Sequence, residues 1–573
     1  MAEIVKNRSY IILLLIIIGG AFFLRVHGIN YHSYGDEHYH VYNSLGLASG
    51  QLPGNFHRIA LFVFYGIYYA LGWVIGIFNS PHEFIGTFYS NMHVFYYVGR
   101  FFESLLGTAS VFFLYVLGRK MFSRTTGLIA ALFLAVSPLA VEISQSARGQ
   151  ALCLLLIIAS MYFAYPTSDN KIRKHFYLLA GLCFGAAFSI RVYSVIILIP
   201  LGYFFFLPET RNNAPAASKL SGALNVLKEV VFSVGPWLLV IGAIFAFSIS
   251  DPKFYNGIVG YFSRKLALLS VGKSSAVIYI GSEEPNVLWY YLSKGFPQAL
   301  GSTLYMISAV ALFWGMLNYK RRNYLALFLT VVLYVLIMGR GSIGAVRYLF
   351  PILPVLLLLV GDMLASASRL TRLSERNQLI SCLVVAALLA FPSVQIANNN
   401  NRRNRLRSTK DLAQEWIFKN FPPGSRIAVE SMGYRGPDLK LTPVIDYWIY
   451  NLSEEELKEI LAERLKAGQP SFALKYFIEN PPHPKFYTDT ISAREIVDIE
   501  KLKEEGYQYF VICSGTRDMY DTELVREKYP DHYLSRQEFY SWLEGEGSVL
   551  KIFEPGNDIP GERLTIYKMQ NEY

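Results

Sequence analysis

The segment YIILLLIIIGGAFFLRV, residues 10–26, sets the fold class of the chain. It holds a single charge, at Arg25, and approaches the roughly 20 apolar residues that a helix needs to cross a bilayer. Lys6 and Arg8 precede it, as basic residues precede the apolar core of a signal peptide. No small-residue cleavage site follows Val26, so we expect a retained signal anchor that spans the membrane.

The composition extends this membrane assignment to most of the chain. The 573 residues are 53% hydrophobic and 17% charged, and the mean hydropathy is +0.30, which is too apolar for a soluble protein of this length. Three of the four cysteines lie within apolar segments, so neither a disulfide framework nor a cysteine metal site is expected. We therefore predict a polytopic α-helical membrane protein with about eleven spans, at residues 10–26, 94–117, 127–141, 150–165, 176–190, 194–207, 230–250, 296–318, 323–339, 347–365 and 378–395.

Basic residues indicate the orientation of these spans. If the N-terminus is inside, every inside connection is basic, as the positive-inside rule requires. The net charge of +10 then follows from topology and does not indicate nucleic-acid binding. We expect a multi-pass protein of the cell (plasma or inner) membrane with a cytoplasmic N-terminus and an extracytoplasmic C-terminal domain. The basic connections lie at 119–124, 171–174, 211–228, 320–322 and 369–376.

One apolar segment, residues 59–78, does not fit as a crossing, because it would move all these basic connections outside. Its tyrosines and Trp73 are typical of a helix at the membrane interface. We therefore expect a transmembrane module at 1–395, in which residues 27–93 form a first external loop with this interfacial helix. The rest of the predicted organisation is a second long external loop at 251–295 and an extracytoplasmic α/β domain at 396–573, with strands at 426–431, 509–514 and 563–569 and helices at 409–420 and 453–467.

The polar residues of the membrane module collect on the external side of this topology. Seven of the ten histidines fall in the first external loop. Ionisable groups at membrane depth are costly to hold, so such a cluster is a candidate functional site. Its other members are Asp36, Glu37 and Arg58 in the first loop, Glu142 and Arg148 at the second external turn, Arg191 at the third, and Arg347 and Tyr348 near the tenth span.

This set of residue types suits group transfer from a phosphate-linked donor. Cations hold the phosphate and stabilise the charge that develops as it leaves. One acid accepts the proton of the attacking hydroxyl, and no second acid is needed because phosphate is already a good leaving group. Simpler explanations stay open: Glu142 could pair with Arg148, and Arg191 and Arg347 could be snorkelling residues at span ends.

The histidines allow an alternative that involves a metal. We expect no cofactor and no metal, but histidine and carboxylate side chains are ligands that Zn²⁺ and Mn²⁺ accept. A divalent cation bound in the first external loop therefore stays open as an alternative, with the ligand set His32, Asp36, His38 and His40.

Several short motifs follow one another in an order that is itself informative. They are Gly35-Asp36-Glu37, Phe56-His57-Arg58, Gly99-Arg100, Ser137-Pro138 with Ser146-Ala147-Arg148, and Arg347-Tyr348-Leu349-Phe350-Pro351. In this order and placement the chain resembles the superfamily of polytopic GT-C-type glycosyltransferases, which includes protein O-mannosyltransferases and the lipid A aminoarabinose transferase. The resemblance covers nearly the whole membrane module.

The resemblance implies a polyprenyl-phosphate sugar as donor, an outward-facing cavity and inversion at the sugar carbon. It assigns the catalytic base to Asp36 and the phosphate-binding role to Arg58, Arg191 and Arg347, with Tyr348 beside them. Glu37, Glu142 and Arg148 are expected to support donor or acceptor. Many relatives have Lys or His followed by proline where this chain has His57-Arg58-Ile59, and many have Lys where Arg191 stands. The resemblance therefore implies the positive charge of the donor pocket but not its geometry.

The sequence thus predicts an integral-membrane inverting glycosyltransferase, a hexosyl- or pentosyltransferase acting on a lipid, glycan or protein hydroxyl at the extracytoplasmic face. Its expected partners are the bilayer, the lipid-linked donor and that acceptor, and not nucleic acid. Two alternatives stay open: a lipid or sugar transporter or flippase, and a non-catalytic subunit of cell-envelope assembly.

Overall fold

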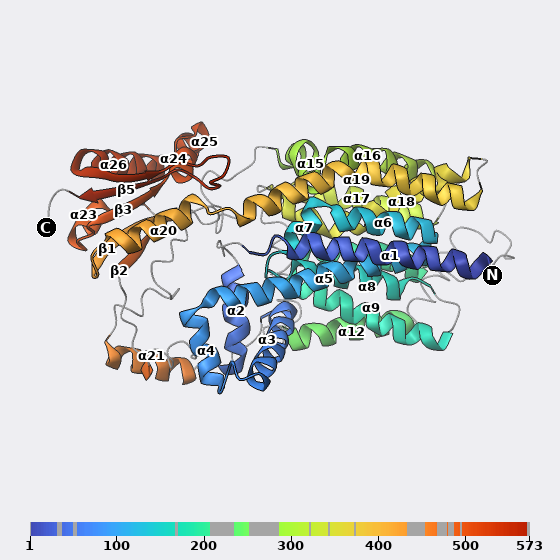
Figure 1. The fold of residues 1–573 in the computed structure, drawn as a ribbon, viewed down its shortest axis with the longest axis horizontal. Helices are drawn as coiled ribbons and strands as arrows, with labels where there is room; N and C mark the ends of the chain where they lie inside the picture. The colour runs from blue at the N-terminus through green and yellow to red at the C-terminus, as the bar shows by residue number, and fades with distance from the viewer. Residues whose placement is uncertain are drawn as a thin grey trace.

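The fold was determined as a computed structural model of residues 1–573. The structure describes residues 2–30, 37–49, 54–166, 170–206, 234–250, 286–319, 322–341, 344–371, 374–431, 453–466, 478–479, 486–492 and 496–569. A helical bundle and a smaller α/β domain lie at opposite ends of the long axis (Figure 1).

The bundle contains a helix at each of the eleven expected apolar segments. Among the described residues, four helices are long and apolar enough to cross a membrane, or up to six if each of two bent pairs counts as one span. The helices are α1 (Ala2–Val26), α5 (Met92–Met121), α6 (Arg124–Val136), α7 (Pro138–Ser144), α8 (Gln150–Ala164), α9 (Asn170–Ile190), α10 (Leu198–Phe206), α12 (Val234–Ser250), α14 (Val287–Tyr290), α15 (Phe296–Leu300), α16 (Ser302–Leu317), α17 (Arg322–Met338), α18 (Leu353–Arg369) and α19 (Glu375–Arg405).

Two of the expected spans are broken by local sequence. Between α6 and α7 the chain bends by 63° at Ser137, and Pro138 takes the first position of α7, where its missing N–H costs nothing. Between α15 and α16 it bends by 117° at Gly301, whose φ of +83° is a conformation that favours glycine. Each bend therefore divides one apolar segment into two helices that point in different directions.

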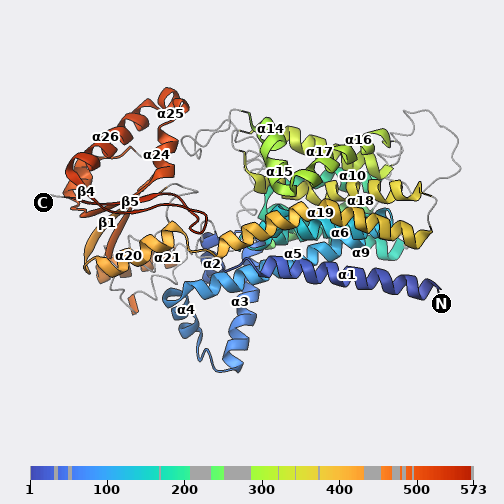
Figure 2. The ribbon, with the colours of Figure 1, turned by 45° about the horizontal axis from the view of Figure 1, so that its top comes forward.

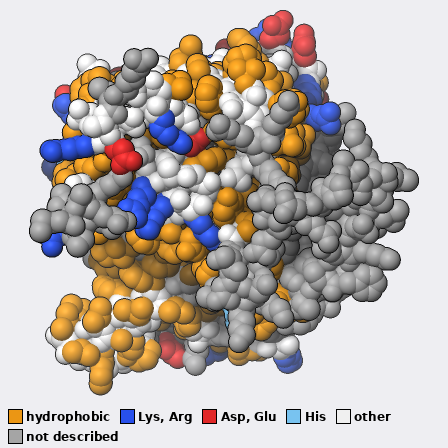
Figure 3. Space-filling view, turned by 90° about the vertical axis from the view of Figure 1, so that its right-hand side faces the viewer, with side chains coloured by type: hydrophobic (Ala, Val, Ile, Leu, Met, Phe, Trp, Pro, Cys, Tyr) orange, Lys and Arg blue, Asp and Glu red, His pale blue; other side chains and the backbone are white. Residues whose placement is uncertain are grey.

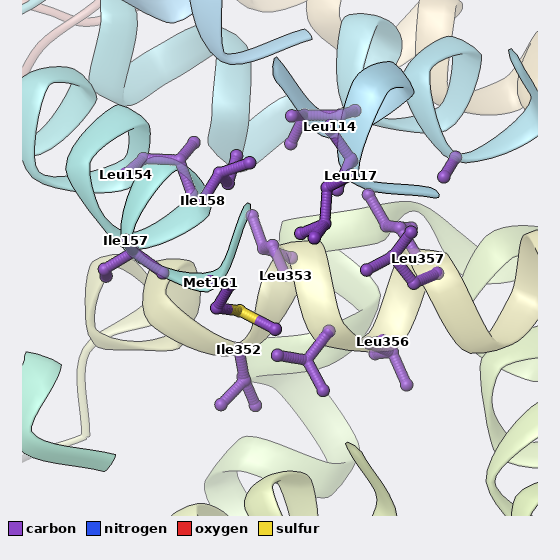
Figure 4. Packing of buried hydrophobic residues seen from close by; sticks show 14 of the residues in the cluster. Leu114, Leu117, Leu154, Ile157, Ile158, Met161, Ile352, Leu353, Leu356 and Leu357 are labelled. Carbon is purple, nitrogen blue, oxygen red and sulfur yellow. The ribbon is translucent and has the colours of Figure 1, made fainter. Parts of the chain in front are cut away.

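The core of the bundle is built around α18. In the most apolar stretch of Val346–Arg369, 89% of the residues are buried, so other helices surround α18. Leu353, Leu356 and Leu357 meet side chains of α5 and α8 (Figure 4). Small residues allow the closest approaches: a Cβ at Gly118 would lie 2.8 Å from the Cα of Gly127, so α5 and α6 touch backbone to backbone.

The first external loop folds into three helices beside the near end of α5. They are α2 (Glu37–Leu45), α3 (Phe56–Val74) and α4 (Pro81–Ser90), with a 3₁₀ turn at Gly46–Ser49. Helix α3 extends away from the bundle (Figure 2) and is not among the helices long and apolar enough to span. Its exposed Val63, Ile67 and Trp73 give it the apolar surface expected of an interfacial helix.

The C-terminal domain is a five-stranded mixed sheet in the order β2-β1-β3-β5-β4. The strands β2, β1 and β3 run parallel, and β5 and β4 add an antiparallel hairpin-like edge. One face packs on α20 (Thr409–Asn420) and the other on α26 (Pro530–Glu546). The remaining elements are β1 (Ser425–Ser431), α21 (Glu454–Lys466), β2 (Phe486–Ser492), α23 (Ile499–Glu504), β3 (Tyr509–Cys513), α24 (Ser514–Tyr520), α25 (Glu523–Lys528), β4 (Gly547–Phe553) and β5 (Leu564–Met569).

Two predicted boundaries fall within helices. The domain boundary expected at 395 lies inside α19, because the asparagines and arginines that follow continue the helix to Arg405. The end of the external loop expected at 251–295 is helical from Val287; residues 251–285 lie outside the described part. The predicted strands at 426–431, 509–514 and 563–569 are confirmed within one residue.

The bundle end far from the C-terminal domain carries basic side chains. Lys and Arg side chains lie on this face among apolar ones (Figure 3). The orientation of the bundle in the membrane stays a prediction, since it rests on the positive-inside rule.

Candidate functional site

The site is organised around the first external loop, where Glu37 is buried and held by Arg100. Its two carboxylate oxygens accept hydrogen bonds from Arg100 Nε at 3.1 and 3.2 Å, and one of them from Arg100 Nη2 at 2.5 Å. The N–H of Ala147 donates to Glu37 Oε1 at 2.6 Å, and Arg100 Nη1 donates to the carbonyl of Ile29. Glu37 therefore joins the first loop, α5 and the second external turn.

A second buried acid, Glu103, lies on α5, about one helical turn beyond Arg100. Its Oε2 accepts a hydrogen bond from the N–H of Ala151 at 3.0 Å, and its Oε1 lies 2.9 Å from His57 Nε2. Both side chains are fully buried. The other ring nitrogen of His57, Nδ1, lies 3.2 Å from Nδ1 of His40. The backbone between the two acid-bound amides turns at Gly149, which has a φ of +78° and packs on the His57 ring.

Three arginines surround His40. The pKa of His40 lies well below its ordinary value because the ring is buried and because His57, Arg191, Arg58 and Arg148 add positive charge nearby. Arg191 Nη2 donates to the carbonyl of Arg148 at 3.2 Å, which brings the second and third external turns together. The Nε atoms of Arg148 and Arg191 are buried and have no hydrogen-bond partner among the described residues.

A cavity of about 510 Å³ adjoins this cluster on the side of the C-terminal domain. Glu142 and Arg148 line one wall, and the end of α19 and the first turn of α20 line the others. The Glu142 side chain is exposed to the cavity. Desolvation by the surrounding wall raises the pKa of Glu142, and the positive charges of Arg148 and Arg347 oppose this shift. Among the described residues Glu142 makes no ion pair with Arg148. The hydroxyl of Ser146 is buried in the same wall and has no partner in the described part of the chain.

Arg347 and Tyr348 reach the site from the 3₁₀ helix Val346–Ile352. The guanidinium of Arg347 lies 5.7 Å from the ring centroid of Tyr348, and this ring lies 5.0 Å from that of Tyr193. Arg347 also lines the cavity, so it belongs to the wall that holds Glu142. Tyr348 packs instead beside the third external turn.

The structure brings together most, but not all, of the predicted site residues. Arg58, Arg148 and Arg191 meet around His40, while Glu142 and Arg347 meet Arg148 at the cavity. Asp36 and His32 lie outside the described residues. His38 Nδ1 lies 2.5 Å from the hydroxyl of Tyr96, whereas Nδ1 of His40 lies beside His57. No group of three possible metal ligands occurs among the described residues.

Sequence reasoning missed Arg100, Glu103 and His57 as parts of this network. Arg100 was noted only in a motif, and Glu103 lay inside a predicted span. Two opposite charges three residues apart within an apolar helix were the signal that could have found them, since such groups are held only with partners.

Comparisons with known proteins agree with this architecture. The family model for dolichyl-phosphate-mannose-protein mannosyltransferase matches residues 89–249. A comparison with curated protein sequences found no match.

Two solved structures share the fold at low sequence identity. ArnT from Cupriavidus metallidurans, in the apo state and bound to undecaprenyl phosphate, has a TM-score of 0.51 and 12% identity, with 98% of each chain covered. The oligosaccharyltransferase AglB from Archaeoglobus fulgidus, in complex with an inhibitory peptide and a dolichol-phosphate, has a TM-score of 0.50 and 13% identity. That match covers 93% of this chain and 72% of AglB.

These findings confirm the resemblance that the ordered motifs indicated. The chain is a membrane protein with the fold of the GT-C-type glycosyltransferase superfamily.

Proposed function

We propose that this protein is an inverting glycosyltransferase that moves a sugar from a polyprenyl-phosphate donor to a hydroxyl acceptor at the extracytoplasmic face. The observation that carries the proposal is the concentration of arginine around His40. Arg148 and Arg191 each bury a guanidinium nitrogen that has no hydrogen-bond partner among the described residues. A buried N–H donor without an acceptor is costly, and a lipid phosphate would supply both negative charge and acceptor oxygens.

The fold relatives support the choice of anion. ArnT has been solved with undecaprenyl phosphate and AglB with a dolichol-phosphate. In the proposed site Arg58, Arg191 and Arg347 bind the donor phosphate, Arg148 links it to the second external turn, and Tyr348 lines its approach. As the bond to the sugar breaks, charge grows on the phosphate, and prearranged cations stabilise that charge without reorganising.

Asp36 is the proposed catalytic base. It directly precedes Glu37, whose bidentate pair with Arg100 fixes the start of α2 beside the arginines. In this proposal Asp36 accepts the proton of the acceptor hydroxyl, and Glu37 acts by positioning the loop. The cavity at Glu142 receives the acceptor, since an exposed carboxylate there can accept hydrogen bonds from hydroxyl groups.

The test replaces Asp36 by Asn in the full chain. Membranes that contain wild-type protein should transfer label from polyprenyl-phosphate sugars, and Asp36→Asn should lower this transfer by at least about 10²-fold, because the base is lost. Expression and binding of the lipid phosphate should stay unchanged.

Glu83→Gln provides the matched control. Glu83 is an exposed acid in the first turn of α4, where it accepts a hydrogen bond from the N–H of Asn79. It belongs to the same external loop but lies outside the site, so its loss should leave transfer unchanged. Full activity in Asp36→Asn would remove Asp36 from the mechanism.

A further inference from the structure

Two buried amide side chains join three parts of the chain next to the proposed donor site. Nε2 of Gln145, at the second external turn, donates to Oδ1 of Asn401 on α19 at 2.7 Å. The same nitrogen donates to the carbonyls of Leu24 and Arg25 at 3.0 and 3.1 Å. Nδ2 of Asn401 donates to the Leu24 carbonyl at 2.7 Å. Gln145 is 3% exposed and Asn401 is fully buried, so water does not compete for these hydrogen bonds. We call Gln145 and Asn401 the amide pair.

The carbonyls that accept these hydrogen bonds lie at the end of a helix. Leu24 and Arg25 belong to the last turn of α1, which ends at Val26. The last four carbonyls of a helix have no partner within that helix. The amide pair supplies hydrogen bonds that the end of α1 needs, and it thereby holds the second external turn and α19 beside α1.

The first member of the amide pair lies three residues before an arginine of the donor site. Gln145 follows the last residue of α7, and its N–H donates to the carbonyl of Glu142 at 3.0 Å. The turn then closes tightly, since the N–H of Arg148 donates to the carbonyl of Ser146 at 2.8 Å. A displacement of Gln145 therefore displaces the backbone of Arg148. The Nε–H of Arg148 is the buried donor that has no partner among the described residues.

The second member of the amide pair lies at the base of the C-terminal domain. Helix α19 ends at Arg405, four residues beyond Asn401, and α20 begins at Thr409. The N–H of Thr409 donates to the carbonyl of Pro560 at 3.0 Å, which joins the first turn of α20 to the segment before β5. Asn401 and Arg148 line the same cavity. The amide pair thus connects the helix that carries the domain with the turn that carries Arg148.

Building on the donor site proposed above, we infer that Gln145 and Asn401 are positioning residues that act through Arg148. The amide pair holds the second external turn so that the buried Nε–H of Arg148 reaches the phosphate, and it couples that position to the end of α19. The coupling is reciprocal, because a ligand that fixes Arg148 also favours the bonded arrangement of the amide pair. Binding of the donor therefore stabilises the end of α19, which lines the proposed acceptor cavity.

Gly28 offers a way to separate the amide pair without changing either amide. It follows the end of α1, and a Cβ at this position would lie closer than van der Waals contact to Oδ1 of Asn401 and Nε2 of Gln145. Its φ lies outside the left-handed region, so Gly28→Ala adds a methyl group without backbone strain. Gly20→Ala is the matched control on α1, because no described atom lies within 4 Å of the added Cβ.

The first measurement is the affinity of the purified full-length protein for farnesyl phosphate, by calorimetric titration. Gly28→Ala should weaken binding by about 10-fold, because Arg148 is displaced from the phosphate. In an Arg148→Gln background the same substitution should change the affinity by less than about 2-fold, since the residue through which the amide pair acts is already lost. Gly20→Ala should leave the affinity unchanged in both backgrounds.

The second measurement is hydrogen exchange at the end of α19, residues 396–405, with and without saturating farnesyl phosphate. In wild type the phosphate should slow exchange there, because its binding at Arg148 favours the bonded amide pair. Gly28→Ala should lose this slowing, whereas Gly20→Ala should keep it. An amide pair with a purely structural role would not transmit phosphate binding to α19.

The outcomes separate the two proposals. If wild type does not bind farnesyl phosphate, the donor site is wrong, and the coupling fails with it. If Gly28→Ala binds as wild type does, or weakens binding equally with and without Arg148, the coupling is wrong and the donor site stands. Equal slowing of exchange in wild type and Gly28→Ala also overturns the coupling. Should Gly28→Ala fail to fold, Gln145→Met removes the donating amide instead and is judged by the same outcomes.

Discussion

Both ends of the helical bundle hold charged side chains that are buried or half-buried, but these side chains differ in their hydrogen-bond partners. At the end far from the C-terminal domain, Lys120 donates to the carbonyls of Tyr162 and Tyr165 at 3.0 and 2.8 Å. Asp362 accepts hydrogen bonds from Thr126 and Tyr324 between α6, α17 and α18. At the other end, Arg148 and Arg191 keep guanidinium nitrogens that no described residue satisfies.

The two ends thus differ in whether the polar atoms of their charged side chains have hydrogen-bond partners among the described residues. A buried polar group with all its partners in the chain contributes to stability, and its removal costs stability. A buried donor atom without a partner, such as Nε of Arg148 and Nε of Arg191, lowers stability, and in the proposed function a lipid phosphate accepts its hydrogen bond. Substitutions at the two ends should therefore change different quantities.

The largest effect is expected from Arg191→Gln. Transfer should fall by about 10²- to 10³-fold, because one prearranged cation is lost from the charge that develops on the phosphate. The thermal unfolding temperature in detergent should stay the same or rise, since like charges around His40 are reduced. Arg340→Gln is the control, an exposed arginine near the same end of the bundle, and should change neither quantity. If Arg191→Gln lowers the unfolding temperature as well as the activity, Arg191 stabilises the fold and the proposed contrast fails.

At the opposite end, Asp362→Asn should do the reverse. The loss of hydrogen bonds to a buried carboxylate should lower the free energy of unfolding by about 2 kcal/mol. Transfer per folded molecule should not change. Tyr324→Phe removes one of the same hydrogen bonds, so the double variant should lose less than the sum of the single losses. If the double variant loses as much free energy of unfolding as the two single variants combined, Asp362 and Tyr324 do not stabilise the fold through a shared hydrogen bond.

A smaller effect is expected at the turn that joins the two buried acids. Gly149→Ala should cost about 1–3 kcal/mol, from a φ of +78° and from a Cβ that would lie 2.5 Å from Cγ of His57. Gly424→Ala has a similar φ of +85° with nothing within 4 Å of the added Cβ, so it isolates the backbone strain. The difference in unfolding temperature between the two variants measures the packing against His57. Equal losses would mean that the turn does not depend on that ring.

The sequence predicted the fold well because its main signals are local. Apolar runs, basic connections and short β-rich segments all depend on neighbouring residues. The helices of the bundle, the interfacial helix, α20, α21 and three of the strands were found, whereas α2, α4 and α26 were not predicted. Strands β2 and β4 were missed because their sequences, FYTDTIS and GSVLKIF, become strands only by pairing with β1 and β5. The continuation of α19 was missed because its polar residues resemble a loop.

The sequence indicated several residues of the site but not the contacts between them. Glu37 was expected to support substrate, and the structure shows it bonded to Arg100 across 63 residues of sequence. The contacts from Glu103 to His57 and from His57 to His40 join three separate helices. Such contacts depend on how helices pack, which spacing along one chain does not encode. The pairing of Gln145 with Asn401, at 2.7 Å, is another example.

The end of α19 also fixes how close an acceptor can come. Residues 398–405 extend the helix past its apolar part by eight residues, which is about 12 Å at 1.5 Å per residue. The C-terminal domain is therefore held at a set height above the apolar part of the bundle, with Glu142 beneath it. We expect this clearance to admit a narrow chain end or a small headgroup and to keep out a hydroxyl on the surface of a folded domain.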